Sequence, residues 1–219
     1  MKFLLLVCLS LLTSSARCDD VFAHPVTGRQ LLDTILAEPS SALAGAKVLQ
    51  GRFVHRKTLS ELPKPLVSTG EFIFARDLGV YWRTREPFDS VFVLTPQGLA
   101  QTDEGAETLR LSADRQPAVR VIAKVFFALF ALDVDALSGS FDLFAAPRAA
   151  RSSEPWTIGL RPKSSAVANV FQRALLTGRR DVEQVVLIDK HGDATTIELR
   201  AVEHSAAEPS AAMRALFAP

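Results

Sequence analysis

The chain has 219 residues, of which 48% are hydrophobic and 22% charged, and its formal net charge is +1. These values exclude an intrinsically disordered chain, because disorder requires low hydrophobicity or a high net charge. They offer no surplus of basic residues to hold phosphates, so we expect no nucleic-acid partner. The aromatic residues are mostly phenylalanine, with 14 Phe beside a single Tyr and two Trp. Such rings form no hydrogen bonds, and they either fill a core or line an apolar cavity.

Residues 1–18 have the pattern of a secretory signal peptide. Lys2 supplies a positive charge, Phe3–Leu12 form an apolar run, and Thr13–Ala16 supply a small-residue exit. The apolar run is too short to span a bilayer. We therefore expect export, with residues 19–219 forming a single soluble domain.

The two cysteines do not form a disulfide in the mature chain. Cleavage after Ala16 leaves Cys18 as the only cysteine, and cleavage after Cys18 leaves none. Removal of the signal peptide takes away Lys2 and Arg17 and no acidic residue, so the mature net charge is −1. The mature chain is close to neutral.

The first part of the mature chain predicts a short helix followed by a meander of strands. Leu31, Leu32, Ile35 and Leu36 recur at helical spacing, and Pro39 is expected to end this helix, with an extension by a turn or two over residues 42–48 as the alternative. Alternating side chains and turn residues then favour short antiparallel strands. The expected strands cover residues 71–74, 80–85, 90–95, 99–102 and 109–111.

Residues 119–132 predict a helix that is apolar almost all round. Its apolar stripe includes Leu129, and only Arg120 and Lys124 mark a polar side. In a soluble protein, such a helix lies between two apolar surfaces or covers an apolar hollow. Plain burial in a core remains an alternative explanation. The stretch is well short of the roughly 20 residues that a membrane-spanning helix requires.

The remainder of the chain returns to strand patterns. Strands are expected at 156–160, 182–188 and 195–202, and Asp189–Asp193 suit a hairpin turn between the last two. The alanine-rich end, 206–219, is either a terminal helix or a frayed end.

The sequence contains no recognisable catalytic or metal-binding motif. The four histidines are isolated, and no cysteine pair accompanies them, so no spacing resembles a metal site. The common hydrolase and nucleotide-binding signatures do not occur. We therefore expect no metal, no cofactor and no enzymatic activity, and a binding protein or carrier is favoured over an enzyme.

Several segments along residues 27–202 form a recognisable series. They are Gln50–Phe53, Leu62–Phe72, Trp82, Glu86–Pro87, Trp156–Pro162 and Asp189–Ile197. In their order and spacing, these segments together resemble the LolA family of outer-membrane lipoprotein carriers, although each segment alone is weakly specific. The Leu-Pro-Lys-Pro-Leu link at 62–66 is similar to a divergent, LolA-related branch.

The resemblance implies a mainly β fold of the α+β class, an incomplete antiparallel β-barrel with a helical lid over a hydrophobic cavity. It implies a periplasmic carrier of a Gram-negative bacterium that shelters the acyl chains of lipoproteins and shuttles them from the inner to the outer membrane. An inner-membrane transporter and an outer-membrane acceptor are then the expected partners. The carrier is expected to be a monomer that contacts membranes only transiently.

The resemblance also implies site residues. Arg76 falls where the family places an arginine that hydrogen-bonds the lid and locks the empty cavity, although the Arg76–Asp77 pair also suits a solvated surface couple. The candidates for the cavity and lid are Phe72, Phe74, Trp82, Val91, Val93, Val121, Ile122, Val125, Phe126, Phe127, Phe130, Ile158, Ile197 and Leu199.

Three other functions remain open at this point. The same fold is compatible with a shuttle for another apolar ligand, such as a fatty acyl or polyene product. An esterase with an unrecognised serine is a further alternative. The phenylalanine-rich stripe is also compatible with a protein docking surface.

Overall fold

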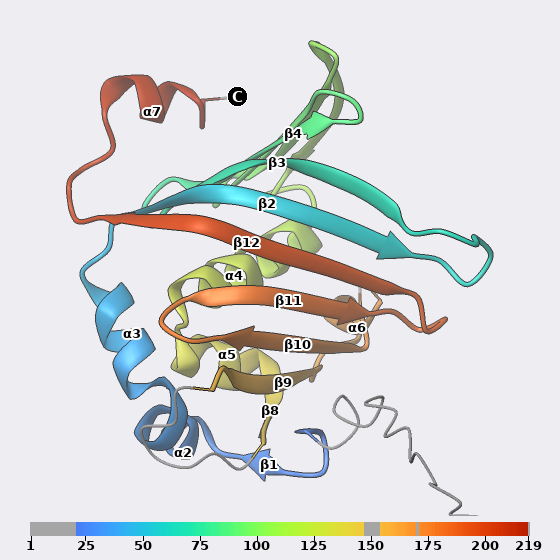
Figure 1. The fold of residues 1–219 in the computed structure, drawn as a ribbon. Coiled ribbons are helices and arrows are strands. Elements are labelled where there is room, and N and C mark those ends of the chain that lie inside the picture. Colours follow the sequence, from blue (N-terminus) through green and yellow to red (C-terminus); the bar gives the residue numbers. More distant parts are fainter. Residues whose placement is uncertain (1–20, 147–153, 170, 219) are drawn as a thin grey trace, which may run out of the picture.

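The computed structural model describes residues 21–146, 154–169 and 171–218 (Figure 1). The expected signal peptide at 1–18 lies outside the described residues. Within the helices, the side chain of Ile122 is also outside the described part.

In the described part of the chain, twelve strands form one antiparallel sheet. The sheet is open, because β1 and β7 lie at its two edges and do not pair with each other. It curls around helix α4 (Figure 1), which confirms the expected incomplete barrel. From edge to edge the strands are β1 (Pro25–Val26), β8 (Phe141–Ala145), β9 (Trp156–Pro162), β10 (Arg173–Gly178), β11 (Val182–Ile188), β12 (Ala194–Ser205), β2 (Val48–Thr58), β3 (Leu66–Ala75), β4 (Gly79–Glu86), β5 (Ser90–Thr95), β6 (Gly98–Asp103) and β7 (Ala106–Ser112).

The helices fall into two groups. Helix α4 lies against the inner face of the sheet, with α5 and α6 near it, and α2 and α3 follow one another at one side (Figure 1). Helix α7 packs on the outer face. The helical segments are α2 (Gly28–Leu31), a π-helical turn η1 (Leu32–Leu36), α3 (Ala37–Ala44), α4 (Pro117–Ala131), α5 (Val134–Ser140), α6 (Ser165–Ala168) and α7 (Ala211–Ala215).

The predicted end of the first helix at Pro39 is wrong, because α3 continues through that proline to Ala44, which is nearer to the alternative of an extended helix. A proline inside a helix has no N–H to donate, and its ring crowds the carbonyl four residues earlier. Here the wider π-helical turn Leu32–Leu36 directly precedes α3. A π-helical turn is one of the local distortions that let a helix change its geometry without ending.

Strands β8 and β10 had no sequence prediction, although both belong to the core of the sheet. Their inner faces carry buried residues such as Phe141 and Leu176, but each strand is short and has little alternation with polar residues. Both pair with β9, which the sequence did predict. A strand buried on both faces cannot be recognised by alternation alone.

A second apolar cluster covers the outer face of β2–β5. The ring of Phe217, just after α7, lies 6.5 Å from that of Tyr81. Helix α7 begins at Ser210, whose hydroxyl accepts a hydrogen bond from the Met213 backbone N–H. The C-terminal segment is therefore a short docked helix, as one of the two sequence alternatives proposed.

The turn into β4 depends on a glycine. Gly79 has φ +142°, and a Cβ there would lie 2.0 Å from the backbone oxygen of Leu94. We expect Gly79→Ala to lower the free energy of unfolding by about 3 kcal/mol or more, because it combines backbone strain with a backbone clash. Gly105 also has a positive φ, +86°, with nothing within 4 Å, so Gly105→Ala serves as the control and should cost about 1 kcal/mol. Chemical denaturation measures both losses, and equal losses would contradict this account.

Candidate functional site

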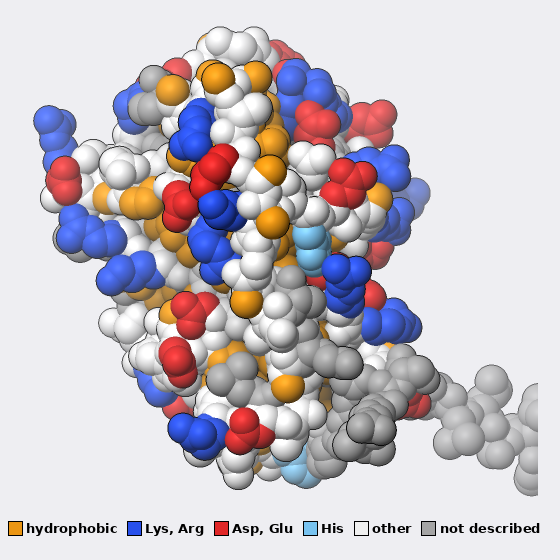
Figure 2. Space-filling model, turned by 90° about the vertical axis from the view of Figure 1, so that its left-hand side faces the viewer, with side chains coloured by type: hydrophobic (Ala, Val, Ile, Leu, Met, Phe, Trp, Pro, Cys, Tyr) orange, Lys and Arg blue, Asp and Glu red, His pale blue; other side chains and the backbone are white. Residues whose placement is uncertain are grey.

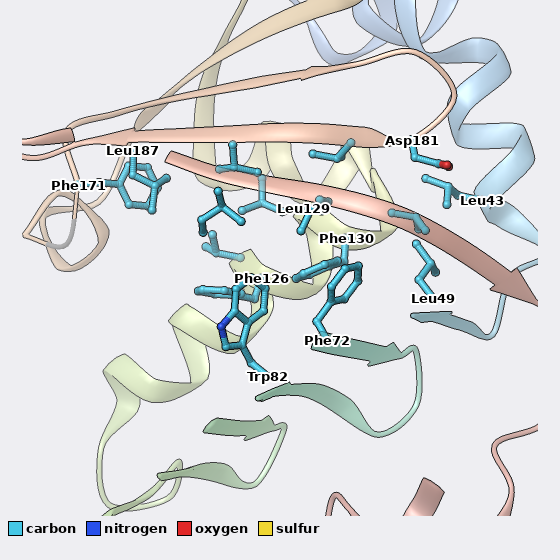
Figure 3. Close-up of a pocket in the computed structure, with 16 residues that line it drawn as sticks. Leu43, Leu49, Phe72, Trp82, Phe126, Leu129, Phe130, Phe171, Asp181 and Leu187 are labelled. Atoms are coloured by element: carbon cyan, nitrogen blue, oxygen red, sulfur yellow. The ribbon is translucent and has the colours of Figure 1, made fainter. Parts of the chain in front are cut away.

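An apolar cavity of about 80 Å³ lies between α4 and the inner face of the sheet (Figure 3). One wall consists of side chains from α4, and the other consists mainly of side chains from β2, β3, β4, β11 and β12, with Leu43 of α3, Phe171 before β10 and Asp181 in the β10–β11 turn at the margins. Apart from Asp181, every lining residue is apolar. The lining residues are Leu43, Leu49, Phe72, Trp82, Val125, Phe126, Leu129, Phe130, Phe171, Asp181, Val182, Val185, Leu187, Ile197, Leu199 and Val202.

Helix α4 contacts the sheet through aromatic rings. Phe130 lies 5.6 Å from Phe72 and 5.3 Å from Phe74, measured between ring centroids, and Phe74 also lies 6.1 Å from Phe127. The helix begins with proline at its first position and ends at Leu132, which adopts the left-handed conformation. These boundaries place the aromatic stripe of the helix over the middle of the sheet.

Trp82 forms the opposite wall of the cavity. Its ring stacks on Phe53 at 3.8 Å, and Phe72 lies 6.0 Å away. Trp82 and Phe126 both line the cavity, Trp82 from the sheet and Phe126 from α4 (Figure 3). Aromatic contacts therefore hold α4 against the inner face of the sheet. Such contacts constrain the relative orientation of the rings and involve no hydrogen bonds.

The structure brings half of the fourteen predicted cavity residues into the lining. Four others are in the core around the cavity without lining it: Phe74 and Ile158 are buried, and Val121 and Phe127 are partly buried against the same cluster. The side chain of Ile122 lies outside the described part. The predicted residues that line the cavity are Phe72, Trp82, Val125, Phe126, Phe130, Ile197 and Leu199.

The placement of Val91 and Val93 in the cavity is wrong. Both pack with Tyr81 in the cluster on the outer face of the sheet. The register pairs Val93 with Tyr81 and pairs Trp82 with Phe92. Because neighbouring residues on a strand point to opposite faces, the face that carries Trp82 also carries Phe92 and excludes both valines.

Several lining residues were not among the predicted site residues. Leu129 belongs to the same helical stripe as Phe126, and Val185 and Leu187 alternate along β11, so both signals were present in the sequence. Val202 lines the cavity only because β12 has a bulge after Arg200 that changes which side chains face inward. Alternation alone cannot reveal such a bulge.

The closed cavity is smaller than the ligand it would have to hold. A volume of about 80 Å³ compares with the ~300–1,000 Å³ of pockets that bury a drug-sized ligand. The partly buried rings of Phe126 and Phe130 belong to the α4 wall and leave little space between it and the sheet (Figure 3). A long apolar ligand can enter only if α4 or its rings move away from the sheet.

Arg76 holds the end of α3. Its Nη2 donates a hydrogen bond to the Leu43 carbonyl at 3.0 Å, and its Nε donates to the Ala46 carbonyl at 3.3 Å. Carbonyls at the end of a helix lack intrahelical partners and attract a cation. The Leu43 side chain lines the cavity, so Arg76 is tied to one wall of the cavity through α3, and its partners are not on α4.

Helix α3 is in turn joined to the end of α4. The Ser40 hydroxyl donates to the Leu132 carbonyl at 3.5 Å. The hydrogen bonds of Arg76 and Ser40 therefore run from the β3–β4 turn through α3 to the C-terminal end of α4. This arrangement can restrain α4 without a direct contact from Arg76.

The charged side chains of the described residues do not gather into a metal site or a patch of one sign on the face seen in Figure 2. No group of three or more His, Cys, Asp or Glu side chains among these residues is placed to hold a metal ion. On the face seen in Figure 2, basic and acidic side chains are interspersed, with apolar side chains between them. Within the described part of the chain, no helix is both long and apolar enough to cross a bilayer.

One Ser–His contact bears on the esterase alternative. His55 Nδ1 lies 3.1 Å from Ser68 Oγ, and burial together with the nearby Lys57 charge lowers the pKa of His55. The two residues pair directly with each other near one end of the β2–β3 ladder. Acyl transfer also needs N–H groups directed at the developing oxyanion, and a single Ser–His contact does not supply them.

A half-barrel that closes an apolar cavity with an aromatic helix defines a binding protein for an apolar ligand. The profile of the outer membrane lipoprotein carrier protein LolA family matches residues 44–213. The chain therefore belongs to the LolA family, whose members are carriers.

Solved structures with similar folds show low sequence identity. A LolA superfamily protein from Nitrosomonas europaea is 11% identical, with a TM-score of 0.44, and the match covers 82% of this chain and 94% of that one. A putative outer membrane lipoprotein-sorting protein domain from Vibrio parahaemolyticus is 6% identical, with a TM-score of 0.42, and the match covers 84% and 98% of the two chains. No curated protein sequence matches the chain significantly.

The ring of Phe130 links the cavity to stability. We expect Phe130→Ala to lower the free energy of unfolding of the ligand-free protein by about 3 kcal/mol, because it removes contacts with Phe72 and Phe74 and enlarges the cavity. Phe88 is 69% exposed, so Phe88→Ala is the matched control and should change stability by less than ~0.5 kcal/mol. Denaturant titration measures both, and equal effects would show that the α4 rings do not stabilise the closed state.

Proposed function

We propose that the chain is a periplasmic carrier that shelters the acyl chains of lipoproteins in this cavity and shuttles them from the inner to the outer membrane. The observation that carries the proposal is an almost wholly apolar cavity beneath a helix, in a member of the LolA family. The carrier acts as a monomer, receives its cargo from an inner-membrane transporter and passes it to an outer-membrane acceptor. It uses no cofactor and catalyses no covalent reaction.

The physical need for a carrier follows from the cost of exposing acyl chains to water. Burial of one methylene is worth about 0.8 kcal/mol, so a long chain released into water costs on the order of 10 kcal/mol. A lipoprotein with more than one chain therefore cannot cross an aqueous compartment unaided. The apolar walls can take over these contacts without demanding a fixed pose of the chain.

Loading replaces ring contacts with ligand contacts. In the closed state Phe130 packs on Phe72 and Phe74, and an acyl chain between α4 and the sheet would provide apolar contacts of the same kind. The net affinity is then the gain from burying the chain minus the cost of opening. The bonds of Arg76 to α3 belong to that cost, which supports a role for Arg76 as the lock of the closed state.

Exposed apolar side chains support transient membrane contact. Leu66 and Val67 at the start of β3 are 53% and 47% exposed, and Phe88 in the β4–β5 turn is 69% exposed. Because Thr69 pairs with Glu86, these side chains project from the same end of two neighbouring strands. Exposed apolar groups gathered at one end can touch a bilayer surface without a membrane-spanning segment.

A shuttle for another apolar ligand is the second candidate function. The same cavity would accept a fatty acyl or polyene product, because its walls select for apolar character and not for one shape. Identification of the bound molecule separates the two candidates.

Acyl binding is tested by the fluorescence of the two tryptophans. Trp82 lines the cavity, whereas Trp156 is 1% exposed and donates from Nε1 to the Arg179 carbonyl. We expect a fluorescent fatty acyl analogue to quench tryptophan emission by energy transfer. A ligand in the cavity touches Trp82 and should also shift its emission wavelength. Trp82→Phe should remove most of this wavelength shift, whereas Trp156→Phe should keep it. A protein that takes up no acyl analogue would refute the carrier function.

Replacement of Arg76 tests the lock. Arg76→Leu removes two hydrogen bonds to the end of α3, so we expect the closed state to lose about 1–2 kcal/mol relative to the open state. The ligand should then bind about 10-fold more tightly and leave correspondingly more slowly, because opening costs less. Arg115→Leu, at an exposed position before α4, is the control. An unchanged release rate, measured by stopped-flow transfer to vesicles, would reject the lock.

A further inference from the structure

One end of the apolar cavity carries a pair of polar side chains. Asp181 is the one charged residue among the described residues that line the cavity. Its Oδ1 lies 2.9 Å from His204 Nε2, and the two side chains are only 21% and 14% exposed. Figure 3 shows Asp181 beside Leu43, at the end of the cavity next to α3.

A tight turn that requires a glycine positions Asp181 at this end of the cavity. Asp181 lies in the short turn between β10 and β11, and its backbone carbonyl packs closely against Gly178. A Cβ on Gly178 would lie 1.9 Å from the Asp181 carbonyl oxygen and 2.8 Å from the Trp156 ring. Only a glycine at position 178 allows the turn to fold this closely against the strand.

A bulge in β12 turns the His204 side chain toward the end of the cavity that carries Asp181. The register of β12 against β2 shifts between Arg200 and Glu203, and Ala201 in the bulge has φ +50°. A left-handed alanine is unfavourable, and bulges of this kind redirect side chains. Without the shift, alternation from Leu199 would turn Glu203 inward. With it, His204 pairs with Leu49, a lining residue, and faces the same side.

The pair has unused hydrogen-bonding capacity. Among the described residues, Asp181 Oδ1 and both ring nitrogens of His204 are buried and make no hydrogen bond, although Asp181 Oδ1 and His204 Nε2 lie within ion-pair distance of each other. Buried polar groups in native proteins are almost always hydrogen-bonded. A carboxylate that accepts and an imidazole that can accept or donate together suit a group that is both donor and acceptor.

We propose that Asp181 and His204 form a polar subsite that binds the hydroxyl or amide group at the polar end of an acyl ligand, while its chain occupies the apolar cavity. The inference rests on the proposed carrier function and specifies its ligand class. A hydroxyl or amide N–H donates to the Asp181 carboxylate, and its oxygen accepts from His204. A ligand that ends in a free carboxylate is disfavoured, because its charge faces that of Asp181.

Competition for an apolar fluorescent probe, N-phenyl-naphthylamine, tests the subsite with three ligands of equal chain length. We expect dodecanol to bind the purified chain about 10-fold more tightly than methyl dodecyl ether, which cannot donate, because a hydrogen bond to a charged group is lost. Dodecanoate should bind more weakly than dodecanol. Equal binding of dodecanol and the ether would overturn the subsite and leave the carrier function intact, whereas failure of all three to displace the probe would count against both.

Two variants assign the preference to the pair. Asp181→Leu and His204→Leu should each reduce the preference for dodecanol over the ether to about 2-fold or less, and Asp181→Asn should tighten dodecanoate binding. The matched controls are Asp142→Leu on β8 and His191→Leu in the β11–β12 turn, both exposed, and these should keep the wild-type preference. Variants that lose thermal stability but keep that preference would show that the pair only joins the β10–β11 turn to β12. If the Leu variants do not fold, the three-ligand comparison on the wild type still decides the proposal.

Discussion

The contact between α4 and the inner face of the sheet is the interaction on which the rest of the structure depends. An open sheet leaves an apolar inner face that must be covered, and α4 covers it with rings that pack on Phe72 and Phe74. The same contact closes the cavity, because Phe126 and Phe130 belong to both the helix and the lining. Stability of the empty protein and capacity for a ligand are therefore opposed: each ring that stabilises the closed state occupies space that a chain needs.

Such opposition suits a carrier better than a storage protein. A permanently wide cavity would expose apolar surface to water when empty, and a rigid core would admit nothing. If the closed state is only modestly stable, the free energy gained by burying the ligand can offset the free-energy cost of opening. In the proposed mechanism, the polar contacts around α3, from Arg76 on one side and Ser40 on the other, contribute to that cost without adding polar groups to the walls.

The sequence predicts the strands of the central meander and the long apolar helix well, because both have a clear period. The pairing of Glu71–Phe74 with Val80–Arg85 and then Ser90–Thr95 appears in the observed register. The face of each strand is harder to predict. The structure puts Trp82 in the cavity lining and Val91 and Val93 on the outer face of the sheet, and the turn between the two strands interrupts the alternation from which a face is predicted. Strands without alternation, such as β8, escape prediction altogether.

The sequence alone does not predict features that depend on an unusual backbone conformation. The π-helical turn before Pro39 carries the first helix through a residue that usually ends one. The left-handed Ala201 reverses the inward face of β12, which brings Val202 and His204 inside. The residues at these two places do not indicate an unusual backbone conformation, because leucine, isoleucine and alanine are also compatible with ordinary helix and strand geometry. Arg76 was located through the family resemblance, and its partners on α3 are visible only in the fold.

The most direct measurement of the central claim is native mass spectrometry of the protein purified under mild conditions from the periplasm of cells that produce it. The account predicts a population whose extra mass is an acylated polypeptide or lipid, released intact when the complex is activated. A protein recovered only in its ligand-free mass, in the presence of excess lipoprotein and lipid, would contradict it.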